Sequence, residues 1–400
     1  MLLSAIKKIS PYRISVALSS LSVLFGLGRE FLIIAMLGFS ASNDQLQIYL
    51  SIYYSIALSG DAVRLAALNL CEKASFAFIL LCATLICAPF TIIVGLLVNY
   101  LAGGLNLTLL WIAITGSFLN LIALLVVTYK QRFGGFLPAQ LINLSPNFVL
   151  IPGILIAYFF AESQLVAWVV GLCCLTSVLQ LLLLPWVKIK QETRKSPDRQ
   201  IKLREGIFVF ARHGVAMLGE QLFQLLTRAA FFKLGAGYLS VLAMSVRVYA
   251  AARVVLVDSY IGSKLASWGN DLQKGELPIE LLLKSVWLQR ALLLITCGVV
   301  CYHRTALSYF SVQLAIIFII SFYLCSLVRV IYFKINHGGH DPNLVVRFGF
   351  YELLFAGLSY LVVTYTSLPL MVLMGLWYVA KPYAQLELLR PKFNKLQVAD

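Results

Sequence analysis

Residues 74–101 read ASFAFILLCATLICAPFTIIVGLLVNYL, and this stretch contains no charged side chain. An α-helix needs about 20 consecutive apolar residues to cross the hydrocarbon core of a bilayer. In lipid every backbone N–H and C=O group needs an internal partner, which a helix supplies within one segment. The stretch therefore predicts a transmembrane helix, and the fold class that follows is an all-α polytopic membrane protein.

The composition of the whole chain agrees with this prediction. Of the 400 residues, 60% are hydrophobic and only 12% are charged, whereas soluble domains carry about 25% charged residues. The mean hydropathy is +0.88. A soluble globule needs more polar residues than this to cover its surface. The composition therefore excludes a soluble enzyme, a secreted disulfide scaffold and a disordered binder.

The same apolar pattern recurs along the chain and predicts about twelve transmembrane helices. They cover residues 12–37, 45–68, 74–101, 105–129, 136–161, 165–187, 207–234, 238–265, 281–302, 309–333, 345–365 and 368–389.

Positive charge is unevenly distributed between the predicted loops, and this sets the topology. Alternate loops are basic and contain Lys7, Lys8, Arg13, Lys73, Lys130, Arg132, residues 188–205, Lys274, Lys334, Arg390, Lys392 and Lys395. The other loops contain one basic residue, Arg304. Since basic loops stay in the cytoplasm, we predict that both termini are cytoplasmic. The loop pattern accounts for much of the net charge of +15, so we expect no nucleic-acid partner.

The longest polar connection, KIKQETRKSPDRQIKLRE at residues 188–205, separates the sixth and seventh predicted spans. We interpret it as a basic cytoplasmic linker between an N-lobe (residues 1–187) and a C-lobe (residues 206–400). Both lobes begin in the same orientation, which favours a parallel repeat. Arg29 and Arg228 each lie nine residues before a loop glycine, Gly38 and Gly237. Two facing six-helix lobes are typical of alternating-access transporters.

Several arginines are predicted to lie within the membrane. At a rise of 1.5 Å per residue, Arg29 and Arg228 lie about 13 Å below the outer surface, and Arg247 reaches a similar depth from the other direction. Charges at such depths are costly and usually face a cavity or a partner. A planar guanidinium group suits a phosphate or diphosphate, because it binds two oxygens at once. Arg253 adds charge from the same predicted helix as Arg247.

Other polar residues within the predicted spans are weaker candidates. We expect supporting or gating acids at Glu30, Asp44, Asp61 and Glu220, and candidate sugar contacts at Asn120, Gln140, Asn143 and Asn147. The amides could equally join helices to one another. Arg64, Lys233, Arg347 and Lys381 lie near span ends and are expected to reach the lipid headgroups. The eight cysteines form no CxxC motif and the histidines are dispersed, so we expect no metal and no cofactor.

The stretch GLGREFLIIAMLGFSASND at residues 26–44 resembles the first-helix signature of the MurJ-type lipid II flippases. These belong to the multidrug/oligosaccharidyl-lipid/polysaccharide (MOP) exporter superfamily. Arg29, Glu30 and Asp44 match the signature, and the segment from Ser245 through Arg247 resembles the eighth-helix motif. The resemblance implies that Arg29 and Arg247 belong to a cationic central cavity that handles a lipid-linked diphosphate, with a lateral gap near the first and eighth helices.

The lipid II flippases have two further C-terminal helices that this chain is not expected to contain. This difference favours the twelve-helix relatives, the Wzx-like flippases of O-antigen, capsule or exopolysaccharide repeat units. We therefore expect a bacterial inner-membrane flippase of an undecaprenyl-diphosphate-linked oligosaccharide, with the lipid-linked substrate, membrane lipids and a polysaccharide polymerase as partners. The alternatives are a cation-coupled multidrug exporter of the same superfamily, a membrane glycosyltransferase or polymerase, and a scaffold for envelope assembly. We do not expect an enzyme, because the outer loops are short and poor in acids.

Overall fold

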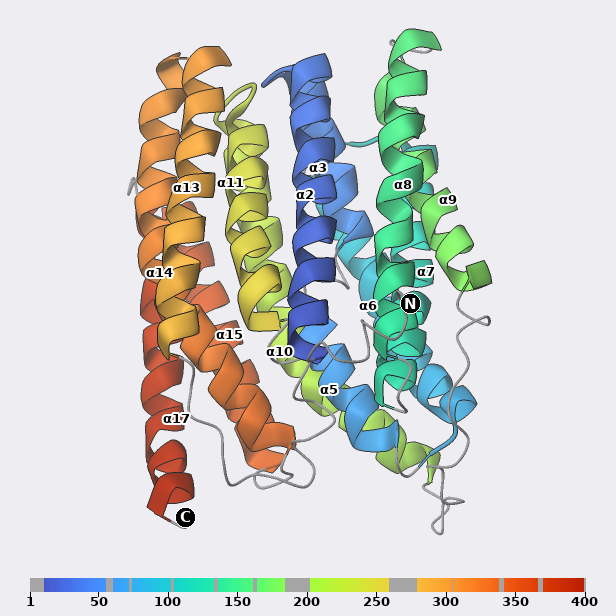
Figure 1. The fold of residues 1–400 in the computed structure, drawn as a ribbon, viewed down its shortest axis with the longest axis vertical. Helices are drawn as coiled ribbons and strands as arrows, with labels where there is room; N and C mark the ends of the chain where they lie inside the picture. Colours follow the sequence, from blue (N-terminus) through green and yellow to red (C-terminus); the bar gives the residue numbers. More distant parts are fainter. Residues whose placement is uncertain are drawn as a thin grey trace, which may run out of the picture.

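The computed structural model describes residues 11–54, 60–71, 74–101, 104–132, 136–160, 164–183, 202–258, 279–303, 305–337, 342–365 and 370–398. Every secondary-structure element in these ranges is a helix, which confirms the predicted all-α class. Most of the helices run along one common direction and form a bundle (Figure 1). The last described helix ends at the lower end of this view, and the first one begins well above that end.

The observed helices follow the predicted spans closely. They are α2 (Pro11–Leu37), α3 (Ala41–Tyr53), α5 (Gly60–Cys71), α6 (Phe76–Leu101), α7 (Leu107–Arg132), α8 (Phe136–Phe160), α9 (Leu165–Leu183), α10 (Leu203–Lys233), α11 (Tyr238–Arg253), η4 (Val254–Asp258), α13 (Ile279–His303), α14 (Thr305–His337), α15 (Pro342–Tyr365), α16 (Leu370–Gly375), η5 (Leu376–Ala380) and α17 (Lys381–Val398). The two η elements are π-helical turns that continue α11 and join α16 to α17.

Six helical segments of the described chain are long and apolar enough to cross a membrane. They are Ser20–Leu37, Phe76–Tyr100, Leu107–Lys130, Leu165–Leu183, Val286–His303 and Leu307–Tyr332. A shorter apolar segment of the described chain, Pro146–Phe160, lies in α8.

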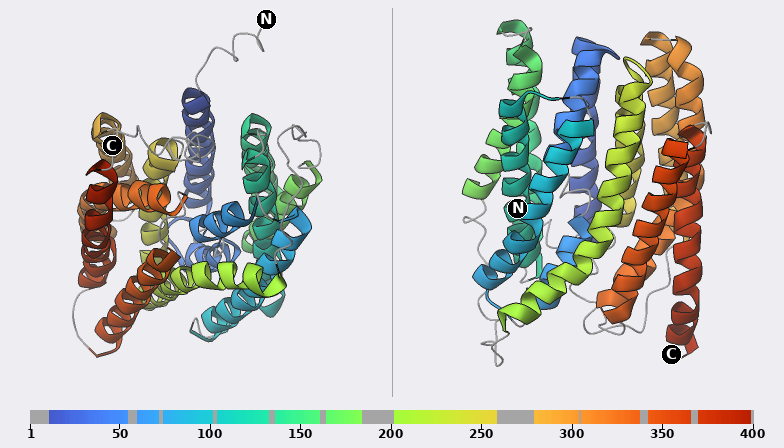
Figure 2. Two further views of the ribbon diagram at one scale, coloured as in Figure 1. Left: turned by 90° about the horizontal axis from the view of Figure 1, so that it is seen from below. Right: turned by 180° about the vertical axis from the view of Figure 1, so that it is seen from behind.

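The helices pack into two groups that follow the order of the chain. In the first group α2 packs against α8, while α3, α5, α8 and α9 all contact α7. In the second group α11 contacts α13 and α14, and α14 contacts α17. The groups lie on opposite sides in the views of Figure 2, and α2 and α3 of the first group contact α11 of the second. Residues 184–201, most of the predicted linker, lie outside the described part of the chain.

Helix α10 connects the two groups more extensively than the sequence suggested. It runs obliquely across the bundle (Figure 2) and packs against α5 and α6 as well as α15. Gly219 allows the contact with α15, because a Cβ atom there would overlap the backbone of Glu352. A glycine at this position therefore sets the distance between α10 and α15.

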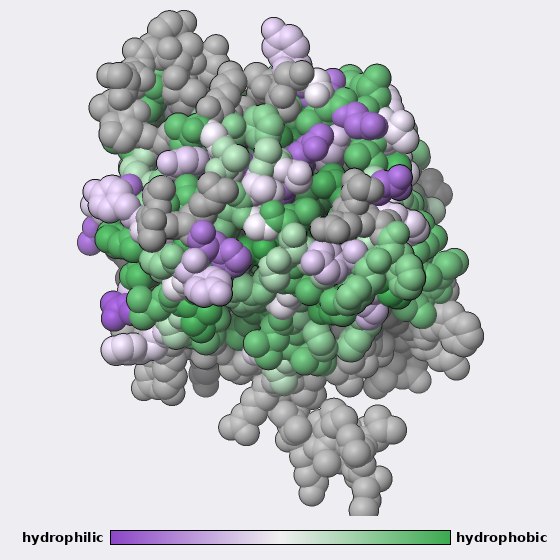
Figure 3. Space-filling view, turned by 90° about the horizontal axis from the view of Figure 1, so that it is seen from above, coloured by the Kyte–Doolittle hydropathy of each residue, from purple (hydrophilic) through white to green (hydrophobic). Residues whose placement is uncertain are grey.

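Two turns meet at one end of the bundle, which we call the outer end after the predicted topology. It holds Gly38, between α2 and α3, and Gly237, between α10 and α11. Gly237 has φ = +94°, and a Cβ atom there would lie 2.8 Å from the carbonyl oxygen of Phe39. Both the backbone conformation and this close contact therefore require glycine. Seen from this end, hydrophobic residues dominate the described surface, and hydrophilic ones form small separate groups (Figure 3).

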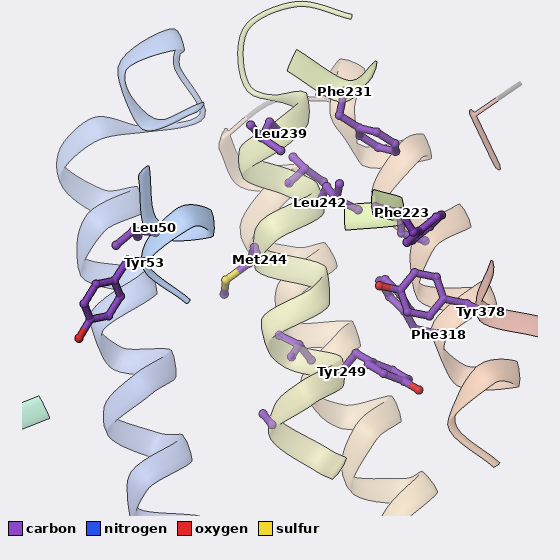
Figure 4. Packing of buried hydrophobic residues seen from close by; sticks show 14 of the residues in the cluster. Leu50, Tyr53, Phe223, Phe231, Leu239, Leu242, Met244, Tyr249, Phe318 and Tyr378 are labelled. Carbon is purple, nitrogen blue, oxygen red and sulfur yellow. The ribbon is translucent and has the colours of Figure 1, made fainter. Parts of the chain in front are cut away.

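Helix α11 contributes side chains to both helix groups (Figure 4). Met244 points toward α3, whereas Tyr249 packs against the rings of Phe318 and Tyr378, with centroid distances of 5.1 and 5.8 Å. Tyr53 on α3 points away from α11 and forms a 2.6 Å hydrogen bond with the hydroxyl of Ser177 on α9. This packing fixes the two helices, α3 and α11, whose central residues form the candidate site.

Candidate functional site

A buried charged cluster lies where α2, α3 and α11 meet. Arg29 and Glu30 follow one another on α2, and their side chains pair at 2.8 Å. Arg29 also donates a 2.9 Å hydrogen bond to the Tyr54 hydroxyl. Arg29 is 5% exposed and Glu30 2% exposed. Helix α3 ends at Tyr53, so Tyr54 lies at the helix terminus, where its ring can stand between α2 and α11.

Arg247 on α11 completes this cluster from the other helix group. Its Nε lies 3.4 Å from the Glu30 carboxylate, and its guanidinium carbon lies 4.6 Å from the centre of the Tyr54 ring. The Arg247 side chain is 31% exposed, while that of Arg29 is 6% exposed. Arg247 is therefore the guanidinium group of the cluster that can reach a ligand, and Arg29 mainly holds Glu30 and Tyr54 in place.

A single carboxylate lies between these two arginines. Gln47 on α3 donates to the second Glu30 oxygen over 3.5 Å and to the Asn43 side chain over 3.3 Å. Glu30 therefore has its acceptors occupied by Arg29, Arg247 and Gln47. Among the side chains that the structure describes here, the cluster carries a net positive charge, which an anionic ligand can neutralise.

Arg247 lies on the wall of a first cavity of about 320 Å³. The cavity is lined by Ser22, Val23, Gly26, Leu27 and Arg29 of α2, Tyr53 and Tyr54, Asn120 of α7, Pro146, Asn147 and Leu150 of α8, Thr176 and Gln180 of α9, and Arg247, Ala250, Ala251 and Val254. Most of these α2 residues precede Arg29. The cavity therefore lies on the side of the arginines away from the outer end.

A second, smaller cavity of about 90 Å³ adjoins the first. Arg228 and Gln224 of α10 line it together with Gln47 and Arg247. Both cavities share Tyr54, Arg247 and Ala250, so Arg247 stands at their boundary. Arg228 and Arg247 both line this second cavity, so like charges face the same space. The structure thus brings together the three arginines, Arg29, Arg228 and Arg247, whose common depth the sequence predicted.

The fourth predicted arginine and four other candidates are placed differently. Arg253 is absent from the lining of both cavities and lies near Tyr249, which packs in the second helix group. Asp61, Gln140, Asn143 and Glu220 belong to described helices, but their side chains lie outside the described part of the structure. Asn120 and Asn147 both line the first cavity, as a role in sugar binding requires.

Asp44 lies at the outer end and joins the two helix groups. Its carboxylate accepts hydrogen bonds of 2.8 Å from the backbone N–H groups of Gly237 and Ser240 and a further one from the Ser240 hydroxyl. These donors belong to the first turn of α11, where free N–H groups and the helix dipole favour a negative charge. This contact links α3 to α11 at the outer end, and the gating role of Asp44 stays a prediction.

A second buried ion pair was missed by the sequence analysis. Lys381 was expected to reach the headgroups, but this is wrong, since its Nζ lies 2.8 and 2.9 Å from the Glu352 oxygens. Gln385 donates to the same carboxylate over 2.8 Å, and the Trp377 ring centre lies 3.7 Å from Lys381 Nζ. Helix α17 continues to Val398, which places Lys381 inside the bundle rather than at its end.

Thr176 and Gln180 of α9 also line the first cavity and were not predicted. They are spaced four residues apart within an apolar run, so they share one helix face. That spacing is the signal that could have identified them. Within the described ranges, no group of three His, Cys, Asp or Glu side chains could hold a metal ion.

Several solved structures with a similar fold are multidrug transporters. A multidrug resistance MATE family transporter of the MOP superfamily matches in its inward-facing conformation (TM-score 0.59, 12% identity, 96% of this chain and 99% of that chain). A multidrug resistance MATE family transporter in its outward-facing conformation also matches (TM-score 0.58, 12% identity, 98% of each chain). The MATE multidrug transporter DinF-BH also matches (TM-score 0.64, 12% identity, 97% of this chain and 95% of that chain).

No protein-family model matches the sequence, and no curated protein matches it. At these identities the structural similarity shows the fold alone. The chain therefore has the fold of MATE family transporters. The matching proteins described above are transporters.

Proposed function

We propose that this protein is a multi-pass transporter of the bacterial inner membrane. Its substrate would be an undecaprenyl-diphosphate-linked oligosaccharide, such as an O-antigen, capsule or exopolysaccharide repeat unit or a lipid II-like precursor. The protein would move this substrate from the inner to the outer leaflet by alternating access. The polymerase that uses the translocated units would be its partner on the outer side.

The observation that carries this proposal is the position of Arg247. It lines both cavities, with Arg29 and Arg228 nearby, and is opposed by one described carboxylate, Glu30. A diphosphate carries the negative charge that would neutralise this cluster, and a guanidinium group binds two of its oxygens at once. A cationic drug would be repelled by the same cluster.

The proposed cycle uses the arrangement of the two cavities. The diphosphate would bind at Arg247 in the first cavity and pass toward Arg228 as the helix groups move relative to one another. Its polyprenyl tail would remain in the lipid. Release requires that one conformation binds the diphosphate less tightly than the other. The contact of Asp44 with the first turn of α11 would have to open for release at the outer end.

The test is replacement of Arg247 by alanine in cells that need the polysaccharide. We expect Arg247→Ala to abolish surface polymer and to cause accumulation of the lipid-linked precursor, while Arg247→Lys retains part of the activity. The matched control is Arg290→Ala, since Arg290 is exposed on α13 beside Trp287. Normal surface polymer from a well-expressed Arg29→Ala/Arg247→Ala double variant would contradict the proposal.

A second candidate function is a cation-coupled multidrug exporter. The comparisons alone favour it, because the similar structures are MATE multidrug transporters. Glu30 would then serve as the buried carboxylate that binds the coupling cation. Glu30 is held by Arg29 and Arg247, which leaves it poorly suited to that role in the described conformation.

Drug sensitivity distinguishes the two candidates. A multidrug exporter predicts that a deletion strain becomes sensitive to cationic dyes and that Glu30→Gln has the same effect. The flippase predicts unchanged dye sensitivity together with a loss of surface polymer. Measuring both properties in the same deletion strain decides between the two functions.

A further inference from the structure

The walls of the first cavity differ in chemistry. The wall formed by α7, α8 and α9 presents the neutral polar side chains of Asn120, Asn147, Thr176 and Gln180. The opposite wall, formed by α11 and η4, presents Ala250, Ala251 and Val254 beside Arg247. A ligand held at Arg247 would therefore meet hydrogen-bonding groups on one side and apolar groups on the other.

The two asparagines on the polar wall are not used in joining helices within the described structure. Neither Asn120 nor Asn147 forms a hydrogen bond with another described residue, although Asn147 is only 8% exposed. No side-chain nitrogen or oxygen of either residue is buried without a partner, so their amide groups are open to the cavity, where polar groups are normally paired with water or ligand. Their position in the cavity therefore indicates that they bind its contents.

The chemistry of this wall specifies the group that it can bind. An asparagine amide offers donors and an acceptor together, while the Thr176 hydroxyl, which donates to the Cys173 carbonyl, offers an acceptor. A sugar hydroxyl can satisfy both kinds of group, whereas a carboxylate only accepts and would leave the amide oxygens unpaired. No described residue on this wall carries a charge to pair with a charged sugar. The wall is therefore suited to a neutral, hydroxyl-rich group.

The size of the cavity limits how much of a substrate it can hold. Ligand sites commonly have volumes of about 300–1,000 Å³, and the volume of about 320 Å³ lies at the lower end of that range. Arg247 and the polar wall occupy the same cavity, so the group bound by the wall must be adjacent to the diphosphate. The remaining sugars would extend out of the cavity.

We propose that Asn120 and Asn147, with Thr176 and Gln180, bind the sugar attached directly to the diphosphate and select a neutral sugar at that position. This inference rests on the proposed flippase function and adds the specificity of its site. The more distant sugars of the repeat unit are then weakly restricted. Substrates with different outer sugars but the same neutral first sugar are expected to be accepted.

Binding of defined lipids to the purified full-length protein in nanodiscs tests this inference. The probes are undecaprenyl diphosphate alone, the same lipid carrying one glucose, and the same lipid carrying one glucuronic acid. We expect the glucose-bearing lipid to bind about 5- to 30-fold more tightly than the bare diphosphate, as two additional hydrogen bonds provide. The glucuronic acid-bearing lipid should lack this gain. Equal affinity for the neutral and the acidic sugar would overturn the proposed selectivity.

The variant Asn120→Leu/Asn147→Leu should remove the gain from glucose while keeping the affinity for the bare diphosphate. Asn69→Leu is the matched control, because Asn69 is exposed on α5. A full gain from glucose in the double variant would overturn the assignment of these residues. The bare diphosphate tests the proposed function separately, since that function fails if the lipid does not bind or if Arg247→Ala leaves its binding unchanged.

Discussion

Two buried carboxylates of this protein have opposite surroundings. Glu30 lies between two guanidinium groups, Arg29 at 2.8 Å and Arg247 at 3.4 Å, and Arg247 borders both cavities. Glu352 faces one ammonium group, that of Lys381, and Gln385 completes its hydrogen bonding. The first cluster has an excess of positive charge and access to a cavity. The second is balanced and enclosed.

The difference shows how the same residue types can serve binding or structure. A balanced buried pair satisfies its own charges and gains nothing from a ligand, so its role is to hold helices together. Trp377 supports this role for Lys381, because its ring stacks on Phe223 of α10 with centroids 3.9 Å apart. A cluster with one acid for two arginines remains incomplete until an anion arrives. The Glu30 and Glu352 clusters therefore differ in their ratio of basic to acidic groups and in their access to a cavity. They do not differ in whether the carboxylate is buried.

The largest expected effect is a loss of folding stability when the buried Glu352–Lys381 pair is broken. Glu352→Gln leaves the Lys381 ammonium group buried without its counter-ion, and breaking a buried pair in this way costs about 3–5 kcal/mol. We expect a large loss of folded protein and a lower midpoint of thermal unfolding in detergent. The double variant Glu352→Gln/Lys381→Met removes both charges and should recover most of the stability. If the single variant is as stable as the parent protein, the pair has no structural role.

Asp44 extends the comparison to a carboxylate that joins the two helix groups. Asp44→Asn removes the charge that accepts from Gly237 and Ser240, and hydrogen bonds to charged groups contribute about 1.5–3 kcal/mol. We therefore expect the outer end to open in at least a tenfold larger fraction of molecules. Spin labels at Ala41 and Ala236, both exposed, would report a second population at longer distance.

The control for this experiment is Ser42→Ala, at an exposed position two residues before Asp44. It should leave the distance distribution unchanged. An unaltered distribution in Asp44→Asn would mean that the contact does not govern opening of the outer end, and that Asp44 only caps α11.

Much of the fold could be predicted because hydrophobic runs directly specify membrane helices. Residues 74–101 predicted a span, and α6 covers Phe76–Leu101. The π-helical turns at Val254–Asp258 and Leu376–Ala380 could not be predicted, because nothing in the local pattern distinguishes them from regular helix. Helix α10 also makes close approaches to α6 at Gly206 and to α15 at Gly219, which are visible only once those helices are in place.

The depth of the candidate site residues in the membrane could be predicted from the sequence, but the directions of their side chains could not. Counting residues from Gly38 and Gly237 placed Arg29 and Arg228 at one level, and the structure brings them together with Arg247. The same counting could not tell which face of α11 carries Arg253. For Lys381 the predicted helix end was too early, so a buried ion pair was interpreted as a headgroup contact. Side-chain direction and long-range partners arise from packing, which local sequence does not encode.

The next largest expected effect is the change in thermal stability when inorganic pyrophosphate binds. Glu30→Gln leaves two guanidinium groups without their carboxylate, so inorganic pyrophosphate should stabilise this variant more than the parent protein. At about ten times its Kd a ligand adds roughly 1.4 kcal/mol of stability. The midpoint of thermal unfolding with and without pyrophosphate measures the gain. Glu352→Gln/Lys381→Met is the reference and should respond like the parent. An equal response in all three proteins would indicate a general salt effect.

The smallest expected effect concerns Tyr54, which contacts both arginines of the incomplete cluster. Tyr54→Phe keeps the ring beside Arg247 but removes the hydroxyl that accepts from Arg29, and one such hydrogen bond contributes about 1 kcal/mol. We expect a small loss of stability and an unchanged affinity for pyrophosphate, because Arg247 is the group that reaches the ligand. Tyr54→Leu also removes the ring and should weaken pyrophosphate binding.

The neighbouring Tyr53 provides a matched control for Tyr54, because its hydroxyl bonds to Ser177 rather than to an arginine. Tyr53→Leu and Tyr54→Leu remove similar volumes from adjacent positions, but only the second takes a ring away from Arg247. If both variants weaken pyrophosphate binding equally, general loosening of α3 is responsible and the Tyr54 ring has no specific role. If only Tyr54→Leu does so, the aromatic ring orients Arg247 toward the anion, whereas the Trp377 ring of the enclosed Glu352 cluster serves packing alone.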